Sequence, residues 1–147
     1  MRKVRLWTYQ SKGFSLTDPN ISVDVTKSRY NRFPSYKDTH AQLSEKIGAE
    51  KHQIIFCYTN YDSRPDEAEI LWELEVPENE VHPIHSPTWE ELIKDSEKQK
   101  DDGMCVKLHN VSIYDGETTG VLKHPIDRTW VLQRRPNPAR RQNSEDS

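Results

Sequence analysis

The sequence predicts an α+β domain with a mixed or mostly antiparallel sheet of six to seven strands and two helices. Two observations carry this prediction. Short segments with strand-like apolar patterns outnumber helical patterns, and the two helical patterns are set apart from the strands rather than alternating with them. A length of 147 residues is typical of one domain, which we expect to span residues 1–135. Residues 136–147 lack apolar periodicity, so we expect a disordered basic and polar tail there.

The first half of the chain holds three strand patterns and one helical pattern. Apolar residues alternate with polar ones over 3–10 and again over 21–26, which predicts two strands. Apolar side chains then recur at helical spacing, which predicts a helix that begins at Ser35 and ends at Gly48. The unbroken apolar run over 53–58 predicts a central strand that is buried on both faces.

The second half contains four strand patterns, at 68–76, 81–85, 104–114 and 129–133. The first of them is the clearest alternation in the chain, and the segment from Pro77 to Glu80 turns it. The second pairs back or continues as an edge strand, and the third is interrupted by a bulge or turn at Asn110. Ser86 and Pro87 begin the second predicted helix, because proline suits the first helical position.

The composition predicts a modest hydrophobic core, and the hydrophobic pattern indicates where in the cell we expect the protein. Hydrophobic residues make up 33% of the chain and charged residues 31%, which is polar for a globular protein. No apolar run approaches the roughly 20 residues needed to cross a bilayer, and the N-terminus lacks the pattern of a signal peptide. We therefore expect a cytoplasmic protein without membrane contact, in which Cys57 and Cys105 stay reduced.

Residues 27–37 alternate cations with aromatic rings. The cations are Lys27, Arg29, Arg32 and Lys37, and the rings are Tyr30, Phe33 and Tyr36. Cations pair with phosphates and rings stack on bases, so this segment indicates a nucleotide or nucleic acid as ligand. Alternatively, the rings cover one edge of the sheet and the cations extend around them into water.

Glu73 and Glu75 lie two residues apart in the predicted 68–76 strand, so both carboxylates face the same side of the sheet. Glu69 shares that side. In a pair of neighbouring carboxylates one group can stay protonated while the other is ionised, which suits acid–base chemistry. The commoner reason for such a row of acids is an ordinary solvent-facing strand.

Other motifs exclude several kinds of site. His82 and His85 have a metal-like spacing, but Pro83 between them disfavours a two-histidine site on a helix, and we expect no metal. The chain has five glycines, too few for a glycine-rich nucleotide loop. Cys57 and Cys105 each fall in a predicted apolar strand, where a thiol is inert.

Two segments together resemble known families. Leu6-Trp7-Thr8-Tyr9-Gln10 and the strand and turn over 69–81 resemble an uncharacterised bacterial and phage family. The same strand and turn also resemble small ADP-ribosyltransferase-like domains, a resemblance that implies NAD as cofactor.

The transferase resemblance also implies roles for particular residues. Arg5 or Gln10 would contact the cofactor. The nicotinamide pocket would be lined by Ser28, Arg29 or Tyr30. The catalytic acid would be Glu73 or Glu75.

The leading hypothesis is an ADP-ribosyltransferase-like domain that binds NAD or another nucleotide between the 27–37 segment and the Glu73/Glu75 strand, with Arg32 among the phosphate contacts. The alternative is a non-enzymatic, phage-encoded protein that captures a nucleotide or blocks a host protein or nucleic-acid machine. Contact with RNA or DNA is a third option, although a net charge of −3 argues against broad duplex binding. If these sites carry no ligand, we expect the binding site to lie around Trp7, Tyr9 and Trp130.

Overall fold

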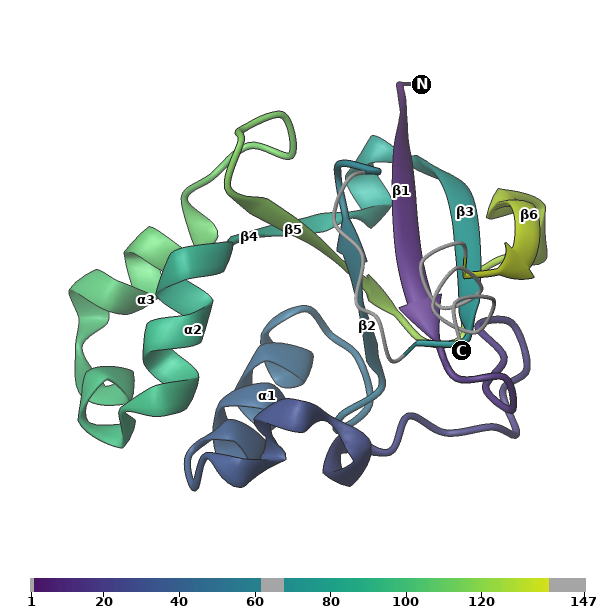
Figure 1. Cartoon of the computed structure of the whole chain (residues 1–147). Coiled ribbons are helices and arrows are strands. Elements are labelled where there is room, and N and C mark those ends of the chain that lie inside the picture. The colour runs from purple at the N-terminus through teal and green to yellow at the C-terminus, as the bar shows by residue number, and fades with distance from the viewer. Residues whose placement is uncertain (1, 62–67, 138–147) are drawn as a thin grey trace, which may run out of the picture.

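The computed structural model describes residues 2–61 and 68–137, without the side chains of Arg29 and Ser96. It has a six-stranded antiparallel sheet in the order β4-β5-β2-β1-β3-β6 (Figure 1). The strands are β1 (Lys3–Gln10), β2 (Ile54–Tyr58), β3 (Ile70–Pro77), β4 (His82–His85), β5 (Thr118–Lys123) and β6 (Val131–Pro136). The helices are α1 (Tyr36–Lys46), α2 (Ser86–Lys94) and α3 (Asp102–His109). The predicted α+β class is confirmed, with three α-helices in the described residues instead of two.

The predicted strand over 21–26 is wrong. These residues lead into a short 3-10 helix, Val25–Lys27, which begins where the Asp24 side chain accepts a hydrogen bond from the Thr26 backbone N–H. The backbone N–H of Val23 donates to the side-chain oxygen of Gln53 rather than to another strand. Side chains thus satisfy the backbone groups that a sheet ladder would otherwise use.

The predicted strand over 104–114 is also wrong, because its first half forms α3. The side chain of Asp101 accepts a hydrogen bond from the Gly103 N–H and so starts the helix. Leu108 is buried, whereas Val106 is 64% exposed, so the apolar residues that alternate in the sequence do not share one buried face. The third helix of the fold comes from this segment.

Strand β5 has no counterpart among the sequence predictions. It lies between β4 and β2, where both of its faces are buried, so its apolar residues do not alternate with polar ones. Gly120 sits at its centre, and a Cβ atom there would lie 3.1 Å from the Val81 side chain and 3.3 Å from that of Leu6. The glycine thus allows a close approach between the strand and the side chains over it.

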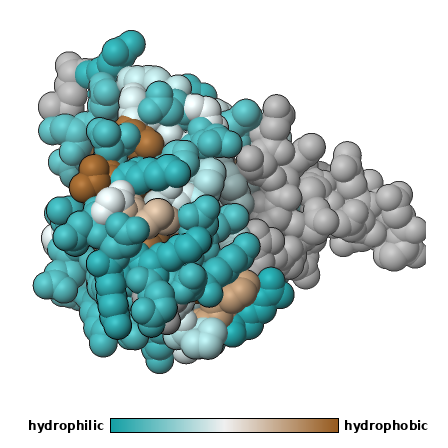
Figure 2. All heavy atoms as spheres, turned by 90° about the vertical axis from the view of Figure 1, so that its left-hand side faces the viewer, coloured by the Kyte–Doolittle hydropathy of each residue, from teal (hydrophilic) through white to brown (hydrophobic). Residues whose placement is uncertain are grey.

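The sheet carries an apolar cluster on each face. One cluster joins Ile54, Ile84 and Val121 of the sheet to the helices, and the α-helical layer lies over β4, β5 and β2 (Figure 1). The other cluster packs the opposite face against connecting segments, through residues such as Leu16 and Ile126. Figure 2 views the molecule from the side of the helices, whose outer surface is mostly hydrophilic with small separate apolar patches.

The two edge strands of the sheet, β4 and β6, can be compared with the predicted strands and with the predicted tail. The predicted edge strand over 81–85 corresponds to β4, and the predicted last strand over 129–133 starts later, at Val131. Strand β6 runs to Pro136, and Asn137 is 1% exposed with its side-chain N–H donating to the Ala68 carbonyl, so the folded part continues into the predicted tail. Residues 138–147 lie outside the described part of the chain. Among the described residues, no helix is long and apolar enough to cross a membrane.

Candidate functional site

Charged and aromatic side chains gather on the half of one sheet face that belongs to β1, β3 and β6. Residues two apart on a strand share a face, and so do residues directly opposite one another on neighbouring antiparallel strands. The register pairs Arg5 with Glu75, Trp7 with both Glu73 and Tyr58, and Glu73 with Gln133. We call this surface the Arg5 face: it comprises Arg5, Trp7, Tyr9, Tyr58, Tyr61, Glu73, Glu75, Gln133 and Arg135.

An ionic network fixes the carboxylates of the Arg5 face. The Arg5 Nη1 atom lies 2.9 Å from Glu73 Oε1, and its Nη2 atom lies 3.7 Å from Glu75 Oε2. Gln133 Nε2 donates to the other oxygen of Glu73 at 2.5 Å, and Lys3 Nζ lies 3.9 Å from Glu75 Oε1. The Glu73 side chain is only 13% exposed, whereas that of Arg5 is 48% exposed. Arg5 therefore joins two acids while keeping part of its guanidinium in water.

Aromatic rings lie beside this network. Trp7 and Tyr61 meet edge to face with ring centroids 6.1 Å apart, and Tyr9 and Tyr58 do so at 5.8 Å. The Arg135 guanidinium lies 5.7 Å from the Tyr61 ring centroid and donates from Nη2 to the Tyr61 hydroxyl at 3.1 Å. All five side chains are half-buried. The Arg5 face thus offers ring surfaces and charged donors to the same neighbouring space.

The 27–37 segment separates its rings from its cations. Its backbone forms the 3-10 helices Val25–Lys27 and Arg29–Arg32. The Tyr36 ring is 5% exposed and packs on Tyr30, and both join the apolar cluster beneath the helices. Burial raises the pKa of the Tyr36 hydroxyl. The guanidinium of Arg32 lies 4.9 Å from the Phe33 ring centroid but is itself exposed. In this segment the rings serve packing, while Lys27, Arg32 and Lys37 are exposed.

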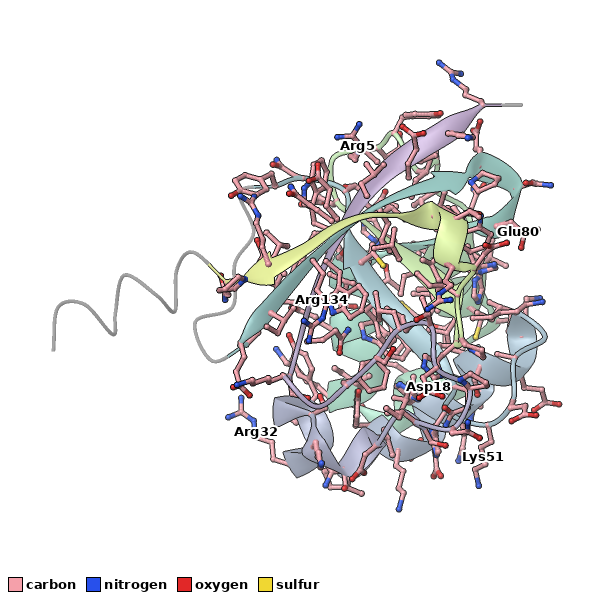
Figure 3. The ribbon with its side chains drawn as sticks, turned by 90° about the vertical axis from the view of Figure 1, so that its right-hand side faces the viewer. Arg5, Asp18, Arg32, Lys51, Glu80 and Arg134 are labelled. Atoms are coloured by element: carbon pink, nitrogen blue, oxygen red, sulfur yellow. The ribbon has the colours of Figure 1, made fainter. Side chains whose placement is uncertain are left out.

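The structure brings together some of the residues predicted for the site and separates others. Arg5, Glu73 and Glu75 form one network, as described above. Gln10 points to the opposite face, because five residues separate it from Arg5 on the strand, and its Nε2 donates to Thr8 Oγ1. A further group of predicted contacts, namely Ser28, Arg29, Tyr30 and Arg32, lies beside α1. Figure 3 shows Arg5 and Arg32 toward opposite ends of the molecule.

Ser28 and Tyr30, two of the residues beside α1, have polar groups that are engaged in local hydrogen bonds. Ser28 Oγ accepts a hydrogen bond from the Tyr30 backbone N–H and so begins the second 3-10 helix. Ser28 is also hydrogen-bonded to the Tyr36 side chain. These contacts give Ser28 and Tyr30 a structural role in holding the segment against α1.

Trp7 and Tyr9 were predicted only as a later option, and Tyr58, Tyr61, Gln133 and Arg135 were not predicted from the sequence. Part of the Arg5 face could have been predicted from the sequence, because Arg5, Trp7 and Tyr9 are two positions apart on one strand and so share a face. The same spacing relates Gln133 to Arg135. The pairing of β3 with both β1 and β6, which brings the two sets together, is a property of the fold.

The histidines and cysteines form no obvious metal centre in the described residues, where no group of three or more His, Cys, Asp or Glu side chains could hold an ion. His82 contacts His109, whereas His85 contacts Thr88, so the predicted metal-like pair is divided between two partners. Burial raises the pKa of the Cys57 thiol to about 12, which makes it inert at neutral pH. Cys105 is exposed on α3 and does not lie in an apolar strand as predicted.

Comparison of the chain with models of protein families, with curated proteins and with solved structures found no match. Similarity therefore shows no family for this chain, and its resemblance to ADP-ribosyltransferase-like domains stays a prediction.

Proposed function

We propose that this chain binds a nucleotide on the Arg5 face, and that NAD is the first ligand to test. One observation carries the proposal: half-buried aromatic rings and the guanidinium groups of Arg5 and Arg135 share a single half of the sheet face. Planar bases stack on aromatic rings, and phosphates bind guanidinium groups. The α-helices lie over the other half of this face, so they do not cover the Arg5 face (Figure 1).

Each chemical part of a nucleotide has a counterpart on the Arg5 face. Trp7 and Tyr61 offer ring surface to a base. The Arg5 guanidinium has five N–H donors, and its contacts with Glu73 and Glu75 leave donors for a phosphate oxygen. The Glu73 carboxylate, fixed by Arg5 and Gln133, is an acceptor suited to the hydroxyl groups of a ribose.

The acids favour a mononucleotide or dinucleotide over a polynucleotide. Glu73 and Glu75 put two negative charges beside Arg5, and they would repel a long phosphodiester backbone. A ligand with one or two phosphates and several hydroxyls loses less from this repulsion. Binding should therefore depend only weakly on salt, whereas a nucleic acid would give a steep dependence.

ADP-ribosyl transfer is a second candidate that one contact favours. The resemblance implies cofactor contact for Arg5 and catalytic roles for Glu73 or Glu75, and Arg5 lies 2.9 Å from Glu73 in the fold. In such a reaction the bond between nicotinamide and ribose breaks, an acceptor bonds to the ribose carbon, and nicotinamide leaves as a neutral amide. A fixed carboxylate at Glu73 would stabilise the positive charge that develops on the ribose.

Calorimetric titration of the full chain with NAD, ADP-ribose and ATP tests the binding proposal. Arg5→Ala and Trp7→Ala should each weaken nucleotide binding by at least about tenfold, or about 1.4 kcal/mol. Arg32→Ala is the matched control, because it removes an exposed arginine far from the Arg5 face. The proposal fails if none of the three nucleotides binds, or if both Arg5-face variants bind as tightly as the wild type.

Glu73→Gln separates binding from transfer. The amide keeps the size of the side chain but removes its charge, so release of nicotinamide from NAD should stop while NAD binding persists. An NAD-binding protein whose wild type releases no nicotinamide would be a binder, and the transfer candidate would be rejected.

A further inference from the structure

Two histidine rings connect α3 to the edge of the sheet, far from the Arg5 face along the strand order. His82 lies on β4, the edge strand, and His109 is the last residue of α3. Their Nε2 and Nδ1 atoms are 2.8 Å apart, and their ring centroids are 5.0 Å apart. At that distance one imidazole N–H donates a hydrogen bond to the unprotonated ring nitrogen of the other, so at least one ring must be neutral.

The rest of α3 is weakly attached. The helix has eight residues, and Leu108 is the one classed as buried. Met104 is half-buried against the apolar cluster, while Val106 is 64% exposed. A short helix with so little buried apolar surface depends on a few contacts to stay in place. Helix α3 also packs on α2, and the His82–His109 contact is a side-chain hydrogen bond that joins its C-terminal end to β4.

The charges around the pair are unfavourable to a second proton. Burial is the largest cause that lowers the pKa of each ring, and His82 lowers that of His109 further. Lys46, in the last turn of α1, adds to the effect on both rings. Among the described residues no carboxylate forms an ion pair with either ring, and the nearby acid Glu117 lies instead 3.5 Å from His85. The C-terminal end of α3 favours a cation, but burial and Lys46 outweigh it, since the pKa of His109 falls to about 4.

We propose that the His82–His109 pair is an acid-sensitive latch, whose protonation beside Lys46 releases α3 from β4 while the sheet stays folded. When both rings are charged they repel each other and Lys46, and the hydrogen bond that joins them is lost. Release would uncover the apolar surface that Leu108 and Met104 now cover, including Ile84 of β4.

The direction of the pH effect follows from the lowered pKa values. A histidine whose pKa is lower in the closed state than the usual 6.5 binds its proton more readily when the helix is released. The latch is therefore fully closed above pH 6.5, and the closed state loses stability as the pH falls from 6.5 towards 4. The shift at His109 alone corresponds to a change of up to roughly 300-fold in the ratio of released to closed helix. Water reaches part of the ring, so we expect a change of at least about tenfold.

Amide hydrogen exchange of the full chain tests the latch. We expect the protection of α3 amides, corrected for the intrinsic pH dependence of exchange, to fall at least about tenfold between pH 6.5 and 4.5. The amides of β1 and β3 report global unfolding, so they should stay more protected than the α3 amides at each pH, even where acid lowers the stability of the whole domain. If α3 is as well protected as β1 and β3 at pH 4.5, it opens only when the whole protein unfolds, and the latch is refuted.

Matched variants remove the charge while keeping a polar atom in place. The amide of His82→Gln mimics Nε2, and that of His109→Asn mimics Nδ1, so either variant should reduce the pH dependence of α3 protection. Lys46→Gln should make the loss of protection between pH 6.5 and 4.5 smaller, because without the neighbouring cation the pKa values of the closed state lie nearer to 6.5. His85→Gln is the control, since His85 bonds Thr88 and not His109. A wild-type pH profile in both His82→Gln and His109→Asn would overturn the proposal.

Discussion

The 27–37 segment and the Arg5 face have similar chemistry but arrange it in opposite ways. Both combine aromatic rings with cations. In the segment, Tyr36 packs inside the helical layer while Arg32 stays exposed. On the Arg5 face, half-buried rings lie next to Arg135, and Arg5 lies beside the acids of β3. The second arrangement places several half-buried rings and charged groups side by side on one sheet face.

Local backbone geometry explains the difference. Successive residues of an α-helix or 3-10 helix point about 100–120° apart, so a ring and a cation that are neighbours in the sequence face different directions. Residues two apart on a strand share a face, and strand pairing adds residues from distant parts of the chain. Strand register is therefore a better guide to a binding surface than the composition of a short segment.

Removal of one aromatic ring from each region should give the largest difference in the free energy of unfolding. Tyr36→Ala should lower the free energy of unfolding by about 3–4 kcal/mol, because it leaves a cavity among packed rings. Trp7→Ala should cost no more than about half as much, because the Trp7 side chain is only half-buried. Urea unfolding measures both. Tyr36→Phe, which keeps the ring, is the control, and an equal cost for the two alanine variants would remove the contrast.

Acid should destabilise the inner side of the 27–37 segment. His40 is 2% exposed and packs on Tyr36 and Phe56, and burial followed by the neighbouring His52 lowers its pKa to about 4. Because the pKa is lowered in the folded state, the stability is present above pH 6.5 and is lost as the pH falls towards 4. The loss can reach about 3 kcal/mol.

Urea unfolding at pH 7 and pH 4.5 measures this effect. His40→Gln should shrink the difference between the two free energies, since the amide does not titrate in this range. A variant with the wild-type difference would show that other groups cause the acid sensitivity. This measurement reports the whole domain, whereas exchange of the α3 amides reports the latch.

Periodic segments of the sequence were predicted well, and segments governed by side-chain to backbone contacts were not. Strands β1 and β3 and helix α1 follow clear apolar repeats that match their burial. The repeats over 21–26 and 104–114 are similar, but Asp24 and Asp101 start helical turns there by accepting backbone hydrogen bonds. Short alternations can therefore be outweighed by one aspartate in the right place.

The candidate site was predicted only in part, for a different reason. Arg5, Glu73 and Glu75 were named from the sequence, and the fold joins them in one network. Gln133 and Arg135 were not named, because they meet Glu73 and Tyr61 only after β6 pairs with β3. These contacts join residues 60 and 74 positions apart, so they depend on topology, which local patterns do not specify.

The smallest expected effects are those of removing one arginine from each region, Arg5 from the Arg5 face and Arg32 from the 27–37 segment. Without ligand, Arg5→Ala and Arg32→Ala should each change the free energy of unfolding by less than about 1 kcal/mol, because both side chains are exposed. With NAD at 100 times the wild-type Kd, ligand binding should stabilise the wild type and Arg32→Ala by about 2.7 kcal/mol. A tenfold weaker Kd in Arg5→Ala would reduce this gain to about 1.4 kcal/mol. Thermal unfolding with and without NAD measures the gains, and an equal loss in both variants would mean that the ligand does not distinguish the Arg5 face from the 27–37 segment.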